Sequence, residues 1–153
     1  MAVVSMPLNL AVLGPDRAAE VIQDHSEIDR WVIGGHSLGG TMAAQYAVKQ
    51  ADNISGVVFL ASYPSDKALI NSNLAILSIY GSEDGLITLP DWQKYHDRFP
   101  MDTHWAFING GNHAGFGWYG EQEGDNPALI SLDRQTEQIS EAIDRFLLSI
   151  ETI

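Results

Sequence analysis

Short apolar runs alternate along this chain with segments of helical periodicity, and this alternation limits the possible folds more than any other feature. The runs are rich in β-branched residues and are bounded by Gly, Pro, Ser, Asn or Asp, a pattern typical of buried strands. We therefore expect five strands, at Ala2–Ser5, Arg30–Ile33, Ile54–Ala61, Leu74–Tyr80 and Thr103–Ile108.

The segments between these runs predict helices over Pro15–His25, Leu38–Gln50, Leu89–Phe99 and Asp133–Ile150. The last pattern is the clearest, because apolar residues recur at helical spacing, namely Ile139, Ala142, Ile143, Phe146, Leu147 and Ile150. Strands that alternate with helices predict an α/β fold with a parallel sheet of about five strands and helices on both faces. A length of 153 residues fits a single domain spanning residues 1–153.

The net charge excludes several classes of partner. With 8 Lys and Arg against 20 Asp and Glu, the chain carries a charge of −12 and should bind neither nucleic acid nor an anionic membrane surface. The absence of Cys excludes disulfides, thiol nucleophiles and thiolate metal sites. The apolar opening segment is interrupted by Pro7 and has no cation before Arg17, unlike a signal peptide or a membrane span. We therefore expect a cytoplasmic protein that needs no cofactor and no metal.

One glycine-rich motif lies where function gathers in such a sheet, at the end of a strand. Residues 35–39, GHSLG, match G-x-S-x-G between a predicted strand and a predicted helix, the context of a nucleophile elbow. Such a turn holds Ser37 in a strained conformation, and neighbours without Cβ leave space around it. The helix that begins at Leu38 directs its free N–H groups at charge beside Ser37. A tight turn with an incidental serine is the alternative, whereas the missing Lys disfavours a phosphate-binding loop.

A serine hydroxyl needs a base, and His113 is the preferred one of five histidines. It lies in the glycine-rich segment INGGNHAGFG just beyond a predicted strand, where its side chain can reach the edge of the sheet. His36 is inside the elbow, where its side chain should point away from Ser37. The other three histidines lie on polar helices or open a strand, and an ordinary surface-loop role is the alternative for His113.

The imidazole needs a carboxylate that fixes its tautomer and stabilises its charged form. Glu83 and Asp84 lie in a turn at the end of the strand in LAILSIYGSEDGLIT, which gives the chain order Ser, acid, His expected for this elbow. We prefer Asp84, which lies one residue deeper in the turn, with Glu83 as the substitute. A solvated acidic turn is the alternative for both.

At these residues the chain resembles the α/β-hydrolase superfamily, and is most similar to small single-domain bacterial members related to dienelactone hydrolases and carboxylesterases. The resemblance extends from MAVVSMP through GGHSLGG, YGSEDGLIT and GGNHAGFG to the last helix. It implies that Ser37 is the nucleophile, Asp84 the orienting acid, His113 the general base and then acid, and the Leu38 N–H one oxyanion donor. The implied reaction is hydrolysis of a small-molecule carboxylic ester through an acyl-enzyme, although thioesters, lactones and amides are cleaved by the same residues.

The aromatic residues after His113 are candidates for the substrate pocket. Phe116, Trp118 and Tyr119, together with His36, could line it, and the alternative is that the three aromatic residues are core residues that anchor the loop.

The chain also departs from the family. Relatives have a strand between the one that matches AVVSMP and the elbow strand, and a loop after it supplies the second oxyanion N–H. We therefore predict a homo-oligomer, most simply a two-fold dimer, in which a partner covers the MAVVSMP region or the edge of the elbow strand. The PLNLAVLG loop would then supply the second donor. A catalytically weak or inactive module for binding or assembly is the alternative function.

Overall fold

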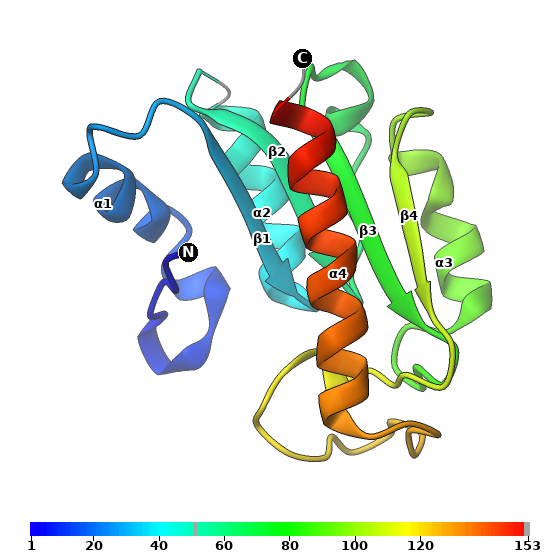
Figure 1. The fold of residues 1–153 in the computed structure, drawn as a ribbon. Coiled ribbons are helices and arrows are strands. Elements are labelled where there is room, and N and C mark those ends of the chain that lie inside the picture. The colour runs from blue at the N-terminus through cyan, green and yellow to red at the C-terminus, as the bar shows by residue number, and fades with distance from the viewer. Residues whose placement is uncertain (51, 152–153) are drawn as a thin grey trace.

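The computed structural model describes residues 1–50 and 52–151 and contains one parallel sheet covered by helices on both faces (Figure 1). Within those residues the sheet has four strands, β1 (Trp31–His36), β2 (Ile54–Leu60), β3 (Ala75–Gly81) and β4 (His104–Ile108), which pair in chain order. The helices are α1 (Arg17–Asp24), α2 (Leu38–Lys49), α3 (Leu89–Tyr95) and α4 (Leu132–Glu151). Short 3₁₀ turns are η1 (Pro7–Asn9), η2 (Ala11–Leu13), η3 (Ala68–Asn71), η4 (His96–Arg98) and η5 (Ala114–Phe116). The predicted α/β class is confirmed.

The parallel register brings the carboxyl ends of all four strands to one edge of the sheet. Gly35 pairs with Phe59, Phe59 with Ser78, and Ser78 with Trp105, so one row of residues crosses the sheet. The segments that follow the strands leave from the edge at which the arrowheads lie in Figure 1. Side chains far apart in the sequence can therefore meet there.

The alternation of side chains along the strands divides the core into two layers. Val57 and Phe59 of β2 face the layer that contains Ala44 and Ala47 of α2 and Phe99. The intervening Val58, with Leu77 and Ile79 of β3, faces α4, which crosses the other face of the sheet in Figure 1. The residues of α4 buried there are Ile139, Ala142, Phe146 and Ile150, four of the six at the predicted helical spacing, while Ile143 and Leu147 pack at the side of this layer.

The predicted strand at Ala2–Ser5 is wrong. This segment has no β-structure, its residues are mostly exposed, and η1 and η2 follow it. A strand requires N–H and C=O groups of a neighbouring strand, and β1, the nearest strand along the chain, pairs only with β2 among the described residues. Apolar and β-branched composition alone does not provide that neighbour, so the sheet has one strand fewer than expected.

The other elements differ from prediction mainly at their ends. β1 continues to His36, past the expected end at Ile33. The helix expected over Leu89–Phe99 ends at Tyr95 and is followed by the tighter turn η4. In the described part of the chain, no helix combines the length and the hydropathy that crossing a membrane requires.

Candidate active site

Ser37 lies between the last residue of β1 and the first residue of α2. Its backbone has a conformation that residues other than glycine rarely adopt. Its φ is 52° and its ψ is −125°. Three hydrogen bonds hold it there: the Ser37 N–H donates to the Leu60 carbonyl at 2.9 Å, and the Ser37 carbonyl accepts from the Gly40 N–H at 3.0 Å and from the Ser62 hydroxyl at 2.5 Å. Strain of this kind persists only where the surroundings impose it, and it is common at functional sites.

The glycines around Ser37 allow the helix to approach the strand. A Cβ on Gly35 would overlap the backbone of Gly39, and a Cβ on Gly40 would lie 2.6 Å from the Gly35 carbonyl oxygen and 2.8 Å from the Ser62 hydroxyl. The expected crowding therefore exists at Gly35 and Gly40. At Gly39 a Cβ would meet no heavy atom within 4 Å.

The side chains of His113 and Asp84 contact each other in the interior, in the segments that follow β4 and β3. The distance from His113 Nδ1 to Asp84 Oδ2 is 2.8 Å, and both side chains are 1% exposed. The other oxygen, Asp84 Oδ1, accepts from the N–H groups of Leu86 at 2.9 Å and Ile87 at 2.7 Å. Because carboxylate oxygens accept hydrogen bonds, Nδ1 of the imidazole is the donor and Nε2 is left for another partner.

Glu83 has different surroundings from Asp84. Its carboxylate accepts a hydrogen bond from the neighbouring Ser82 hydroxyl at 2.7 Å, at an exposed position. Of the two consecutive acids, the structure therefore brings Asp84, and not Glu83, to the imidazole of His113.

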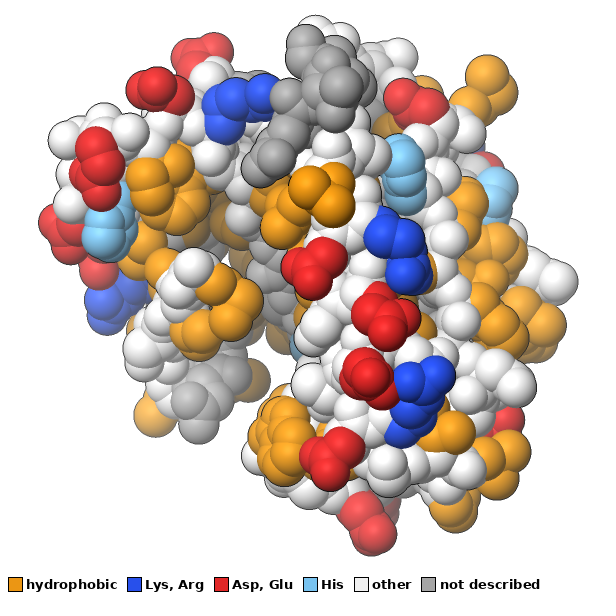
Figure 2. All heavy atoms as spheres, in the orientation of Figure 1, with side chains coloured by type: hydrophobic (Ala, Val, Ile, Leu, Met, Phe, Trp, Pro, Cys, Tyr) orange, Lys and Arg blue, Asp and Glu red, His pale blue; other side chains and the backbone are white. Residues whose placement is uncertain are grey.

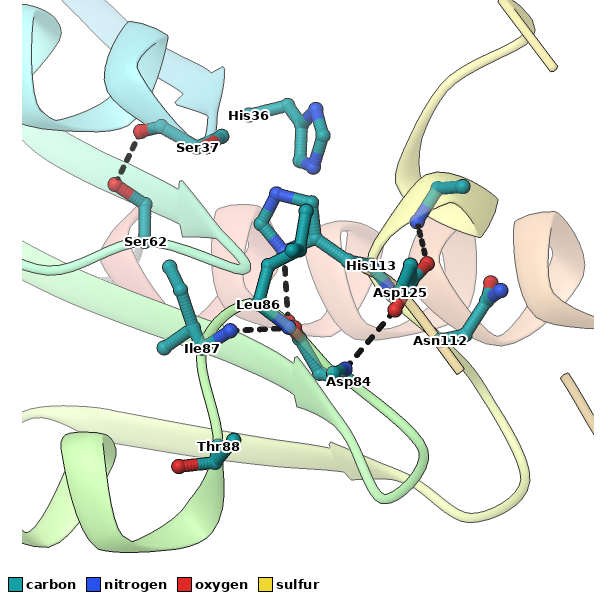
Figure 3. Close-up of polar contacts among 12 residues, drawn as sticks. His36, Ser37, Ser62, Asp84, Leu86, Ile87, Thr88, Asn112, His113 and Asp125 are labelled. Carbon is teal, nitrogen blue, oxygen red and sulfur yellow. Dashed lines mark hydrogen bonds and ion pairs between the residues drawn. The ribbon is translucent and has the colours of Figure 1, made fainter. Parts of the chain in front are cut away.

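Asp125, which the sequence analysis missed, ties the two loops of this pair together. Its Oδ1 accepts from the Gly85 N–H at 2.9 Å and from the His113 N–H at 3.3 Å, and its Oδ2 accepts from the Ala114 N–H at 2.8 Å. Figure 3 shows this carboxylate between the turn after β3 and the turn that carries His113. The segment before Asp125 is acidic and glycine-containing, and nothing local marks this one acid as structural.

The ring of His36 contacts the ring of the candidate base, His113. Its ring centroid is 4.5 Å from that of His113, and Figure 3 shows the His113 ring between Asp84 on one side and His36 and Ser37 on the other. In the part of the chain that the structure describes, no hydrogen bond joins the Ser37 hydroxyl to His113. We expected the His36 side chain to point away from Ser37. In the structure, the His36 ring faces the His113 ring.

The electrostatic surroundings keep His36 neutral. Burial, and then the nearby His113, lower the pKa of His36 from 6.5 to about 4, although Asp84 and a hydrogen bond with the His113 backbone act in the opposite direction. The hydroxyl of Tyr119 is hydrogen-bonded to Nδ1 of His36. Burial raises the pKa of Tyr119 to about 12, so the phenol keeps its proton at neutral pH.

The other candidate pocket residues divide between core and surface. Phe116 is 8% exposed and packs in the layer beneath α4, while its ring also stacks on His36 at 6.0 Å. Trp118 and Tyr119 are 72% and 55% exposed. Leu38, whose N–H begins α2 beside Ser37, is 46% exposed.

A hollow of about 470 Å³ lies beside η5, on the loop that carries His113. Its walls include Asn112, Gln122, Asp125 and the buried Gln135, whereas Ser37 and His36 do not line it. Gln135 accepts from the Asn112 N–H at 3.2 Å and donates to the Asn112 carbonyl at 2.8 Å, so this wall of the hollow also supports the residue before His113.

The comparison with known protein families identifies the family of this chain. Residues 1–137 match the family model described as "Alpha/beta hydrolase family", and the chain belongs to that family. No curated protein matches the chain by sequence.

Solved structures share its fold at low identity. A CIB-like hydrolase of Thermoplasma acidophilum is 18% identical with a TM-score of 0.59, and the match covers 85% of this chain and 58% of that one. A carboxylesterase of the thaumarchaeon Nitrososphaera gargenis is 11% identical with a TM-score of 0.67, over 90% of this chain and 71% of that one. A dienelactone hydrolase-like phosphotriesterase from metagenomic libraries is 12% identical with a TM-score of 0.61, over 86% of this chain and 58% of that one. This chain thus spans less than two thirds of two of these three proteins.

Proposed function

We propose that this chain is a serine hydrolase that cleaves carboxylic esters, with Ser37, His113 and Asp84 as its catalytic triad. The observation that carries the proposal is the fully buried His113–Asp84 contact, 2.8 Å long, at the same sheet edge as the strained Ser37. A neutral imidazole with Nδ1 held by a carboxylate presents Nε2 as a base, which is what a serine hydroxyl requires.

The reaction proceeds in two displacements. Ser37 Oγ attacks the ester carbonyl while His113 Nε2 takes its proton, and His113 then protonates the departing alkoxide as the C–O bond breaks. Water next attacks the acyl-enzyme, with His113 again as base, and releases the carboxylic acid and free Ser37. Asp84 orients the imidazole and stabilises its charged form in both steps.

The negative charge that develops on the carbonyl oxygen needs hydrogen-bond donors. The Leu38 N–H is the first candidate, because it opens α2 and has no partner within the helix. The second candidate is a backbone N–H of the 7–14 loop, since η2 of this loop lies against α2.

The substrate class is a small carboxylic ester. Structural neighbours named as a carboxylesterase and as an esterase of Thermogutta terrifontis support this choice. Thioesters, lactones and amides are cleaved by the same catalytic groups. Comparing the rates of hydrolysis of p-nitrophenyl esters of increasing acyl length with those of a thioester and a lactone therefore ranks these substrate classes.

Labelling with a fluorophosphonate probe tests the proposal directly, because only an activated serine reacts. We expect the wild-type protein to be labelled and Ser37→Ala to be unlabelled, with ester hydrolysis reduced on the order of 10⁴- to 10⁶-fold. Ser65→Ala is the matched control, because it removes the hydroxyl of an exposed serine outside the elbow and should still be labelled. An unlabelled wild-type protein would instead favour the alternative of a binding or assembly module.

A further inference from the structure

Tyr119 reaches back over the candidate site from a segment bounded by two glycines. A Cβ on Gly117 would overlap the ring of Tyr119, so the ring lies directly on that glycine. The backbone of Gly117, with φ −148° and ψ 170°, is extended and open to any residue. The absence of a side chain at position 117 is therefore required by the position of Tyr119 and not by the backbone.

The phenol of Tyr119 ends on His36, which precedes Ser37. The two ring centroids are 5.5 Å apart with an interplanar angle of 25°, and the hydroxyl is hydrogen-bonded to Nδ1 and lies 3.3 Å from Nε2. A protonated phenol beside a neutral imidazole can donate its O–H to the lone pair of Nδ1, and this is the direction that we assign to the contact. The proton of His36 is then on Nε2.

On its other side His36 contacts the candidate base. The rings of His36 and His113 are 4.5 Å apart, with an interplanar angle of 52°. Phe116 stacks on the ring of His36 at 11° and restricts its rotation. His36 is thus fixed on three sides, by Tyr119, Phe116 and His113.

We propose that Tyr119 and His36 are positioning residues. The Tyr119 hydroxyl fixes the Nε2–H tautomer and the orientation of His36, and His36 in turn holds the His113 imidazole toward Ser37. This inference rests on the proposed function for its kinetic part. A neutral residue is needed at position 36, because His113 becomes positively charged when it takes the proton of Ser37. The other ionisable groups that face His36 are Asp84, Asp125 and Tyr119.

The kinetic test compares two substitutions that act on the same contact. Tyr119→Phe removes only the hydroxyl, and Gly117→Ala displaces the whole ring from His36. Each should lower kcat about 10-fold, corresponding to the loss of one hydrogen bond, with KM changed less than twofold. The double variant should be no slower than the worse single variant, since both remove one interaction. Tyr95→Phe, which removes a phenol hydroxyl from α3, is the control and should keep wild-type kcat.

The tautomer of His36 is measurable without activity. Long-range ¹H–¹⁵N correlation spectra of the wild-type protein at pH 7 should show His36 as the Nε2–H tautomer, and Tyr119→Phe should shift it toward a tautomer mixture. Wild-type kcat in Tyr119→Phe, or an unchanged His36 spectrum in that variant, would overturn the pair. An inactive, unlabelled wild-type protein that still shows the predicted tautomer would refute the proposed function and retain the Tyr119–His36 contact.

Discussion

At the scale of single residues, two consecutive acids differ only in their surroundings. Asp84 is buried against His113, whereas Glu83 bonds to Ser82 at the surface. We predict that Asp84→Asn lowers kcat roughly 10⁴-fold, because an amide favours the wrong imidazole tautomer, and that Glu83→Gln changes it little. His113→Ala should be as damaging as Ser37→Ala. Steady-state kinetics on a p-nitrophenyl ester measure all of these variants, and a reversed order of the two acids would assign the role to Glu83.

A second prediction at this scale concerns the pH dependence of stability. His36 has a pKa of about 4 in the folded chain, against 6.5 for an ordinary imidazole. Between these values the unfolded chain binds a proton that the folded chain does not, so the free energy of unfolding falls as the pH falls from 6.5 to 4. His36→Gln cannot titrate and should flatten this part of the curve, as measured by urea unfolding at several pH values.

The matched control for the loss of an imidazole is His25→Gln, at an exposed histidine. This variant should keep the wild-type slope between pH 6.5 and 4. A wild-type slope in His36→Gln would show that His36 is not the source of the acid sensitivity.

At the scale of elements, one carboxylate joins the loops after β3 and β4. Asp125 accepts hydrogen bonds from backbone N–H groups of Gly85, His113 and Ala114. Asp125→Ala would leave these donors unpaired, and we predict a decrease of about 2–4 kcal/mol in the free energy of unfolding. kcat should also fall at temperatures where the variant remains folded, because His113 loses its backbone support.

Urea unfolding followed by circular dichroism measures the first effect and ester hydrolysis the second. Glu123→Ala removes an exposed acid from the same segment and serves as the control. A difference of about 0.5 kcal/mol corresponds to one weak hydrogen bond. If the free energies of unfolding of Asp125→Ala and Glu123→Ala differ by less than this, the Asp125 carboxylate does not hold the loops together.

At the scale of the whole molecule, two regions of the surface differ in the side chains that they expose. Figure 2 shows acidic and basic side chains along the outer face of α4 and hydrophobic side chains on the N-terminal segment, which a hollow separates from the rest of the molecule. The exposed apolar residues of that segment are Met1, Val3, Leu8, Leu10, Val12 and Leu13. β1, an edge strand of the described sheet, lies on the side of this segment in Figure 1.

We propose that a second copy of the chain covers the N-terminal segment or the free edge of β1, forming a homodimer. Edge strands and apolar patches promote such pairing, whereas the charge of −12 on each copy opposes it. Dimerisation should therefore strengthen as added salt screens the charge, and light scattering coupled to gel filtration at low and high salt measures this.

Val12→Asp should weaken the dimer, and Ile70→Asp, at an exposed residue of η3, is the control. If the partner helps to place an oxyanion donor, the monomeric variant should lose on the order of 10²- to 10³-fold in kcat. A monomer with full esterase activity at micromolar concentration would refute the assembly proposal.

Local sequence patterns were sufficient to predict the layered α/β class, the position of the Ser37 elbow and the amphipathic α4. These features depend on local periodicity and on short motifs, and the residues that produce them are neighbours along the chain. The candidate acid and base could also be named from the sequence, since parallel strands end at one edge and the turns after β3 and β4 carry Asp84 and His113.

Contacts between residues that are distant in sequence could not be predicted and are seen only in the folded chain. Asp125 supports Gly85 from 40 positions away, and Tyr119 meets His36 across 83 positions, distances over which no periodicity carries information. The same reason explains the missing strand at Ala2–Ser5. Its composition suits a strand, but strand formation depends on a hydrogen-bonding neighbour, and only the packed chain determines whether that neighbour is present.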